Sequence, residues 1–213
     1  VRSRAFFKSI GVQARYLRRR WRHAPVGLPR FQAASGLIYA GLALEGSGGT
    51  ILTEGIAALG REAETAIDSE GGVTSRNPEH LVEIFAILTW AAQALGDANH
   101  APAPQHVSAM ARLANAIRAL RLGDGRMARF HGGGRGVEGR LDTVLAAAGT
   151  KAQAAKGLAM GYARLSAGRT TMVVDAAARR GESPEAAART ARYEAIAAVL
   201  DARTMLLTAH HLD

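Results

Sequence analysis

The residues most able to do chemistry lie in two short segments, the first of which runs from Arg76 to His80. Histidine titrates near neutral pH, so His80 could act as a general base. The same segment is a good helix start, with Asn77 as the cap, Pro78 at the first helical position and an acid in the first turn. The alternative is that Asn77 and Pro78 only cap this helix and that His80 is a surface residue.

The second segment, Phe130 to Arg135, joins a histidine and an arginine to three glycines. Glycines permit positive φ and let a ligand approach the backbone closely, so His131 could lie over a binding cleft. No Gly-Lys-Ser/Thr follows the glycines, which argues against a phosphate-binding P-loop. The alternative is an ordinary surface loop.

Helices and then strands must position these segments. Apolar residues recur at helical spacing over about residues 28–44, 51–67, 78–95, 105–122 and 137–148, with Gly, Asp and Asn between them. After Gly161, residues 162–165 and 170–174 predict two short strands joined by a turn around Gly168. Residues 183–185 then begin another helix, and residues 205–208 resemble a buried strand. The lengths suggest stacked helical hairpins, although no sequence repeat defines them.

The composition excludes several kinds of site. The 213 residues contain no cysteine, so disulfides, thiolate metal sites and cysteine nucleophiles are ruled out. No apolar run approaches the roughly 18 residues that span a bilayer, and we expect neither a cofactor nor a metal site. No signal peptide is visible, but Val1 stands where Met would begin a chain. We therefore expect the true start to be missing and predict no compartment.

The positive charge is concentrated at one end of the chain. The net charge is +9, and residues 1–22 hold eight basic side chains and no acid. Because the rest of the chain is nearly balanced, the distribution argues against nucleic acid as a partner of the whole fold. An amphipathic first helix with its arginines in water would explain the charge. A surface that grips an acidic polymer, either polysaccharide or nucleic acid, is the alternative.

Over about residues 1–176 the order of these features resembles the heparinase II/III family of polysaccharide lyases. In that family a Gly-Gly turn leads to Arg-Ser-Pro and a Tyr-His pair at a helix start, and Gly71 to Leu81 is similar to it. The stretch from Gly161 to Asp175 is similar to the opening of the family's β-sandwich. The resemblance implies a mainly α fold: an incomplete α/α toroid of helical hairpins over residues 1–156, then a short β-hairpin over 157–178. A C-terminal helix-strand unit of possibly foreign origin, residues 179–213, would follow.

The resemblance also implies a function, because these lyases cleave uronic-acid-containing anionic polysaccharides by β-elimination. By position, Arg76 would neutralise the substrate carboxylate and His80 would be a weak base. The candidate substrate-binding residues are Asn77, His131 and Arg135. The chain departs from the family twice: His80 replaces the proton-transferring tyrosine, and the strand with the family's catalytic and metal-binding histidine is missing. We therefore expect little or no lyase activity.

The tail resembles a different family. Residues 181–213, which end in Thr-Ala-His-His-Leu-Asp, are similar to a fragment of tRNA(Ile)-lysidine synthetase. That family's pyrophosphate-binding Ser-Gly-Gly-x-Asp-Ser loop is absent, which weighs against ATP-dependent tRNA modification. We favour a hybrid or truncated reading frame over a chance match. A non-catalytic helical module that binds polyanions is the remaining alternative, and the oligomeric state is not predicted.

Overall fold

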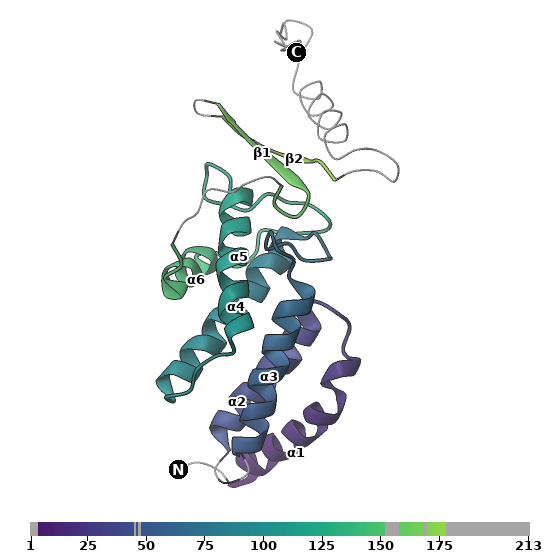
Figure 1. Cartoon of the computed structure of the whole chain (residues 1–213), viewed down its shortest axis with the longest axis vertical. Helices are drawn as coiled ribbons and strands as arrows, with labels where there is room; N and C mark the ends of the chain where they lie inside the picture. Colours follow the sequence, from purple (N-terminus) through teal and green to yellow (C-terminus); the bar gives the residue numbers. More distant parts are fainter. Residues whose placement is uncertain (1–3, 45, 47, 152–157, 168–169, 178–213) are drawn as a thin grey trace, which may run out of the picture.

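The computed structural model describes residues 4–177 except 45, 47, 152–157 and 168–169, and this part of the chain is mainly helical. Six α-helices precede a two-stranded sheet (Figure 1). In chain order the elements are α1 (Arg4–Arg20), the 3-10 turn η1 (Trp21–His23), α2 (Leu28–Ala43), α3 (Gly48–Ala66), α4 (Pro78–Asp97), α5 (Pro104–Leu120), α6 (Arg140–Ala148), β1 (Tyr162–Ala167) and β2 (Thr170–Asp175). The predicted mainly α class is confirmed, while the predicted helix-strand unit of residues 179–213 lies outside the described residues.

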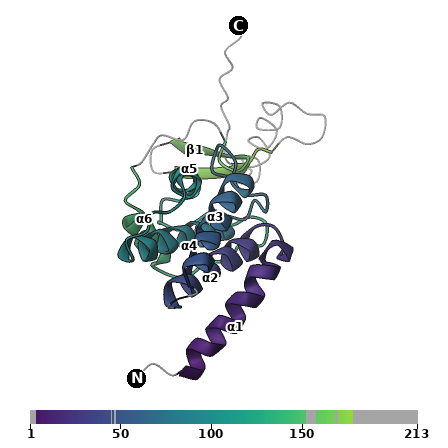
Figure 2. The ribbon, with the colours of Figure 1, turned by 60° about the horizontal axis from the view of Figure 1, so that its bottom comes forward.

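The helices stack as hairpins in two layers. Helix α2 packs on α3, and α4 packs on α5; in addition α2 contacts α4, and α3 contacts α5. Helix α6 continues the layer of α2 and α4, and α1 packs on α2 at the other end of the row (Figure 2). The predicted stacking of helical hairpins is therefore present in the described part of the chain. Its assignment to an α/α toroid stays a prediction.

The core lies where these hairpins meet. Two glycines let α2 and α3 approach closely, since a Cβ at Gly41 would lie 2.6 Å from the Leu52 nitrogen and one at Gly55 would lie 2.8 Å from the Ile38 nitrogen. Around this contact the largest fully buried side chains come from α2, α3, α4 and α5: Phe31, Leu37, Ile38, Leu59, Leu81, Ile84, Phe85, Leu88, Leu95, Leu113 and Ile117. The burial of these apolar side chains stabilises the packing of the four helices, and so it holds in place the helix ends that carry the candidate residues.

The start of α4 matches the prediction. The Asn77 side chain accepts a hydrogen bond from the Glu79 amide at 2.8 Å, and Pro78 occupies the first helical position. Helix α6 begins at Arg140 rather than at 137, because Gly139 before it adopts a positive φ of 75°. Residues 136–139 are therefore loop, and this loop helps to form the pocket described below.

The two predicted strands form an antiparallel hairpin in which Tyr162 lies opposite Asp175 and Ala167 lies opposite Thr170. The hairpin lies beyond one end of the helical layers (Figure 1). Arg164 donates hydrogen bonds to the carbonyls of Ala119, at 3.1 Å, and Arg121, which ties β1 to the end of α5. The register places Tyr162 and Asp175 together at the open end of the hairpin.

Candidate functional site

Arg76 joins the helical layers to the open end of the hairpin. Its Nε donates to the Met160 carbonyl at 2.9 Å, and its Nη2 lies 2.5 Å from Oδ1 of Asp175. The guanidinium carbon lies 4.7 Å from the centre of the Tyr162 ring, within the range of a cation–π contact. Arg76 holds these groups from a left-handed backbone conformation, with a φ of 50°. Its Nη1 has no hydrogen-bond partner among the described residues.

Tyr162 is the buried centre of this cluster, with 1% of its surface exposed. Its hydroxyl donates to the Arg76 carbonyl at 2.8 Å, and the Phe130 ring stacks on it with 4.4 Å between the centroids. Burial raises the pKa of Tyr162 to about 12, against a smaller opposing effect of Arg76. Tyr162 is therefore protonated at neutral pH, and its proton is committed to a backbone carbonyl.

His131 approaches the same cluster from the glycine loop. Its Nε2 lies 3.8 Å from Oδ2 of Asp175, and its ring is exposed. The Asn77 side chain donates to the His131 carbonyl at 3.3 Å, so the residue that caps α4 also holds the loop. A Cβ at Gly133 would lie 2.8 Å from the Asn77 Oδ1, so this glycine is explained by packing against Asn77. The structure thus brings Arg76, Asn77 and His131 together.

The Asp175 carboxylate interacts with both Arg76 and His131. Partial burial on its own raises the pKa of Asp175. The hydrogen bonds from Arg76 and the Ala177 amide, with the positive charge of Arg76 and a smaller electrostatic effect of His131, outweigh burial and hold that pKa below its usual value. Asp175 is therefore ionised at neutral pH.

His80 does not join this group. Its Nδ1 lies 3.3 Å from the Ser75 hydroxyl, and this is the hydrogen bond that its ring makes within the described part of the chain. On the helical surface after Asn77 it is half-buried. The geometry thus places the cap and the arginine in the cluster and leaves the proposed base outside it.

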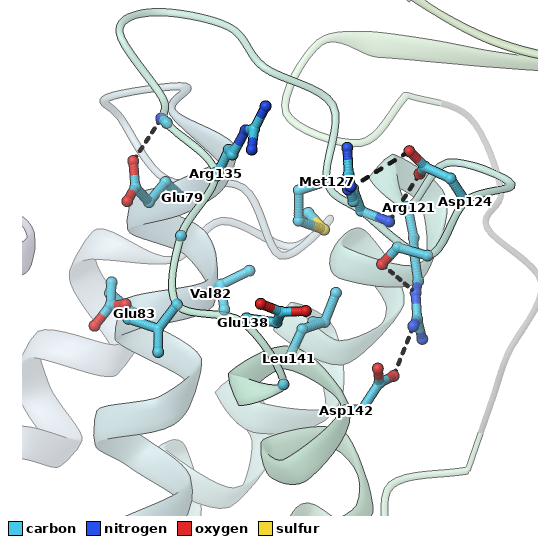
Figure 3. Close-up of a pocket in the computed structure, with 16 residues that line it drawn as sticks. Glu79, Val82, Glu83, Arg121, Asp124, Met127, Arg135, Glu138, Leu141 and Asp142 are labelled. Atoms are coloured by element: carbon cyan, nitrogen blue, oxygen red, sulfur yellow. Dashed lines mark hydrogen bonds and ion pairs between the residues drawn. The ribbon is translucent and has the colours of Figure 1, made fainter.

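Arg135 lines a pocket of about 480 Å³ next to the cluster (Figure 3). The wall from α4 carries Glu79, whose Oε2 accepts a hydrogen bond from the Gly134 amide at 2.6 Å. Figure 3 shows Arg121 at the opposite wall, where it pairs with Asp142 at 2.6 Å. The glycine loop therefore separates the two features, with His131 facing the cluster and Arg135 facing the pocket.

The pocket has a mixed charge. Three arginines and five acids line it, namely Arg121, Arg126, Arg135, Glu79, Glu83, Asp124, Glu138 and Asp142. The acids are in excess, so the interior does not favour a densely anionic group. The carboxylates and guanidiniums offer acceptors and donors to a ligand rich in hydroxyl groups. Arg135 is exposed and forms no ion pair with any described residue, so an anionic group would bind at the rim.

Sequence reasoning named Tyr162 and Asp175 only as strand residues and missed their part in the site. A usable signal was present, because antiparallel strands joined by a tight turn must bring their outer ends together. It also missed the acids and Arg121 of the pocket, which come from three separate segments. Nothing in the spacing of these residues marks them as neighbours.

Two further findings concern metal ions and membranes. Within the described ranges, no group of three or more His, Asp or Glu residues is placed to hold a metal ion. None of the helices described is both long and apolar enough to cross a membrane.

Comparisons with known proteins give two partial similarities. The chain is 36% identical over 115 residues to FtsZ-localized protein C of Caulobacter vibrioides, and this aligned stretch covers 53% of this chain and 19% of that protein. It is 58% identical over 40 residues to tRNA(Ile)-lysidine synthase of Methylococcus capsulatus, and this aligned stretch covers 19% of this chain and 9% of that enzyme. The chain thus matches less than a fifth of the length of either relative. No family model and no solved structure matches it.

Proposed function

We propose that this chain is a fragment of a heparinase II/III-like protein and binds a uronic-acid-containing anionic polysaccharide at the junction of its helices and hairpin. The observation that supports this proposal is that His131 lies close to the neighbours Arg76 and Asn77, although it is more than fifty residues further along the chain. Arg135 faces the adjoining pocket from the same loop. These are the residues for which the family resemblance implies contact with substrate.

The chemistry of the surface suits an acidic sugar. A uronate carries one carboxylate among several hydroxyl groups. Arg135 offers an exposed guanidinium at the rim, and the mixed pocket beside it offers hydrogen-bond partners for hydroxyls. Arg76 is already paired with Asp175, so it contributes Nη1 at most and mainly positions the hairpin. The expected role of Arg76 in neutralising the substrate is accordingly a smaller one in this proposal.

We expect binding without efficient β-elimination. The Tyr162 hydroxyl has a pKa of about 12 and donates to a backbone carbonyl, so it is a poor base. His80 lies outside the cluster and hydrogen-bonds Ser75. His131 is the remaining candidate base, and its Nε2 faces the Asp175 carboxylate at 3.8 Å rather than an open position in the pocket.

The experiment measures binding and turnover on the same samples. The intact chain is titrated with alginate and heparin oligosaccharides by calorimetry, and the ultraviolet absorbance of unsaturated uronate product is followed in parallel. The binding variant is His131→Ala with Arg135→Ala, and the matched control is Arg129→Ala, an exposed arginine just before the same loop. We expect the double variant to bind about tenfold more weakly and the control to bind normally. Equal binding by the double variant would refute this site, and rapid product formation would refute the expected lack of catalysis.

A second candidate rests on the first of the two relatives. The similarity to FtsZ-localized protein C covers about half of this chain, and the name of that protein ties it to FtsZ. We infer association with FtsZ as the second candidate function of this chain. Cosedimentation of the chain with FtsZ polymers tests it, and a chain that stays in the supernatant would rule it out.

The second relative belongs to the family that residues 181–213 resemble by sequence. We keep the hybrid reading frame as a proposal, to which the match adds a stretch of 40 residues at 58% identity to tRNA(Ile)-lysidine synthase. Because the match covers 9% of that enzyme, it carries no proposal of tRNA modification by this chain.

A further inference from the structure

Helix α1 leaves large apolar side chains exposed. It packs on α2, and Ala14 is the one residue along α1 that is fully buried. Phe6 is 60% exposed and Tyr16 is 65% exposed, and Tyr39 on the neighbouring α2 is 41% exposed. Figure 2 shows α1 projecting from the rest of the helical layers. Exposed aromatic residues gathered along two adjacent helices are typical of an interaction surface.

These helices line an open groove of about 990 Å³. Its lining is mostly apolar and comes from both helices: Phe6, Phe7, Ile10, Val12, Gln13, Ala14, Tyr16 and Leu17 from α1, and Gly36, Tyr39, Ala40, Leu42 and Ala43 from α2. The stretch from Phe6 to Leu17 is roughly 16 Å long at the rise of an α-helix, or about three turns. A concave apolar groove of this length fits the apolar face of another helix.

The charge around the groove selects the partner. Residues 4–44 contain eight basic side chains and no acid. Arg18 is paired with Glu54 of α3 at 2.5 Å, whereas Arg15 and Arg19 are exposed and form no ion pair with any described residue. If a second copy of the chain docked here through the same surface, its positive charges would lie against these positive charges. An acidic partner would neutralise them.

We propose that the groove between α1 and α2 is the docking site for an acidic amphipathic helix of a partner protein. Helix α1 lies away from the hairpin, which is beyond the opposite ends of the helices (Figure 1), and the site does not depend on the proposed polysaccharide function. A bilayer is the other acidic surface that a basic amphipathic helix can meet. The apolar side chains here line a groove shared with α2, which suits a helix better than a flat lipid surface.

The test uses a labelled synthetic helix of roughly 18 residues, with Leu on one face and Glu on the other. The affinity of this peptide for the intact chain is measured by fluorescence anisotropy. A matched peptide carries Lys in place of Glu, and vesicles of phosphatidylglycerol and phosphatidylcholine serve as the lipid probe. The chain variants are Tyr16→Glu in the groove and Arg15→Glu with Arg19→Glu beside it. Val107→Glu, at a residue of α5 that is 53% exposed and outside the groove, is the control.

The intact chain should bind the Glu peptide, and both groove variants should bind it about tenfold more weakly while Val107→Glu is unchanged. The Lys peptide should not bind. No binding of the Glu peptide, or equal binding by the groove variants, would overturn the proposal. Vesicle binding that replaces peptide binding would assign the surface to lipid, and a dimer lost in Tyr16→Glu would assign it to a second copy. Circular dichroism of each variant checks that it is folded.

Discussion

Replacing Arg76 by Ala should release the hairpin while leaving the helices folded. A two-stranded hairpin is marginally stable by itself in water, so β1 and β2 depend on their contacts with the helical layers. Arg76 supplies three of these contacts: the hydrogen bond to Met160, the ion pair with Asp175 and the cation–π contact with Tyr162. The buried helical core does not involve Arg76 directly.

The size of the effect follows from those three contacts. A hydrogen bond to a carbonyl, a partly exposed ion pair and a cation–π contact contribute about 1, 0.5–1 and 0.5–1 kcal/mol, respectively. The ion pair is kept at the low end because its side chains are 27% and 41% exposed. The hairpin should therefore lose about 2–3 kcal/mol of local stability, which corresponds to a rise in local opening of roughly 30- to 160-fold.

Hydrogen exchange measures this directly. Amides of β1 and β2 in Arg76→Ala should exchange faster by that factor, while amides of α2 and α4 keep their rates. Arg76→Lys should recover part of the protection, because it keeps the charge and loses the forked geometry. Arg129→Ala, which removes an exposed arginine, should exchange like the parent. Unchanged hairpin exchange in Arg76→Ala would refute the argument that Arg76 anchors the hairpin.

Three further predictions concern the supports of the site. Gly71→Ala should unfold the chain or cost at least about 2 kcal/mol in a urea titration, because a Cβ at this left-handed position overlaps the Arg112 carbonyl; full stability would contradict it. Asn77→Ala should cost about 1 kcal/mol or more in the same titration, from the loss of the cap to Glu79, and an effect near zero would count against the capping role. The pKa of Asp175 is depressed in the folded chain, so its contribution to hairpin stability should be complete above its ordinary value and vanish as the pH falls through the folded value. Hydrogen exchange against pH should show this loss in the parent and not in Asp175→Asn.

Local sequence signals predicted the elements near the site well. The Asn-Pro-Glu start of α4 and the two apolar runs on either side of Gly168 each depend on neighbours in the chain, and both appear in the structure. Helix α6 was predicted to begin at residue 137, but it begins at Arg140, because Gly139 before it has a left-handed backbone. The spacing of apolar residues does not show whether the φ angle of a glycine is positive or negative.

The site itself was only partly predictable. Arg76, Asn77 and His131 were singled out as separate motifs, and their convergence depends on how two helical layers and a hairpin meet. Asp175, which links two of them, was visible only as the end of a strand. Long-range contacts of this kind carry no local periodicity, so single-sequence reasoning cannot pair them.

The most direct measurement maps the bound polymer on the chain. Hydrogen exchange is recorded for the intact protein with and without a uronic-acid oligosaccharide at saturating concentration. We predict that added protection concentrates in residues 131–136, the loop that carries His131 and Arg135, and at the open end of the hairpin. Protection confined to the basic residues of α1, or none at all, would contradict the proposal that the junction binds the polysaccharide.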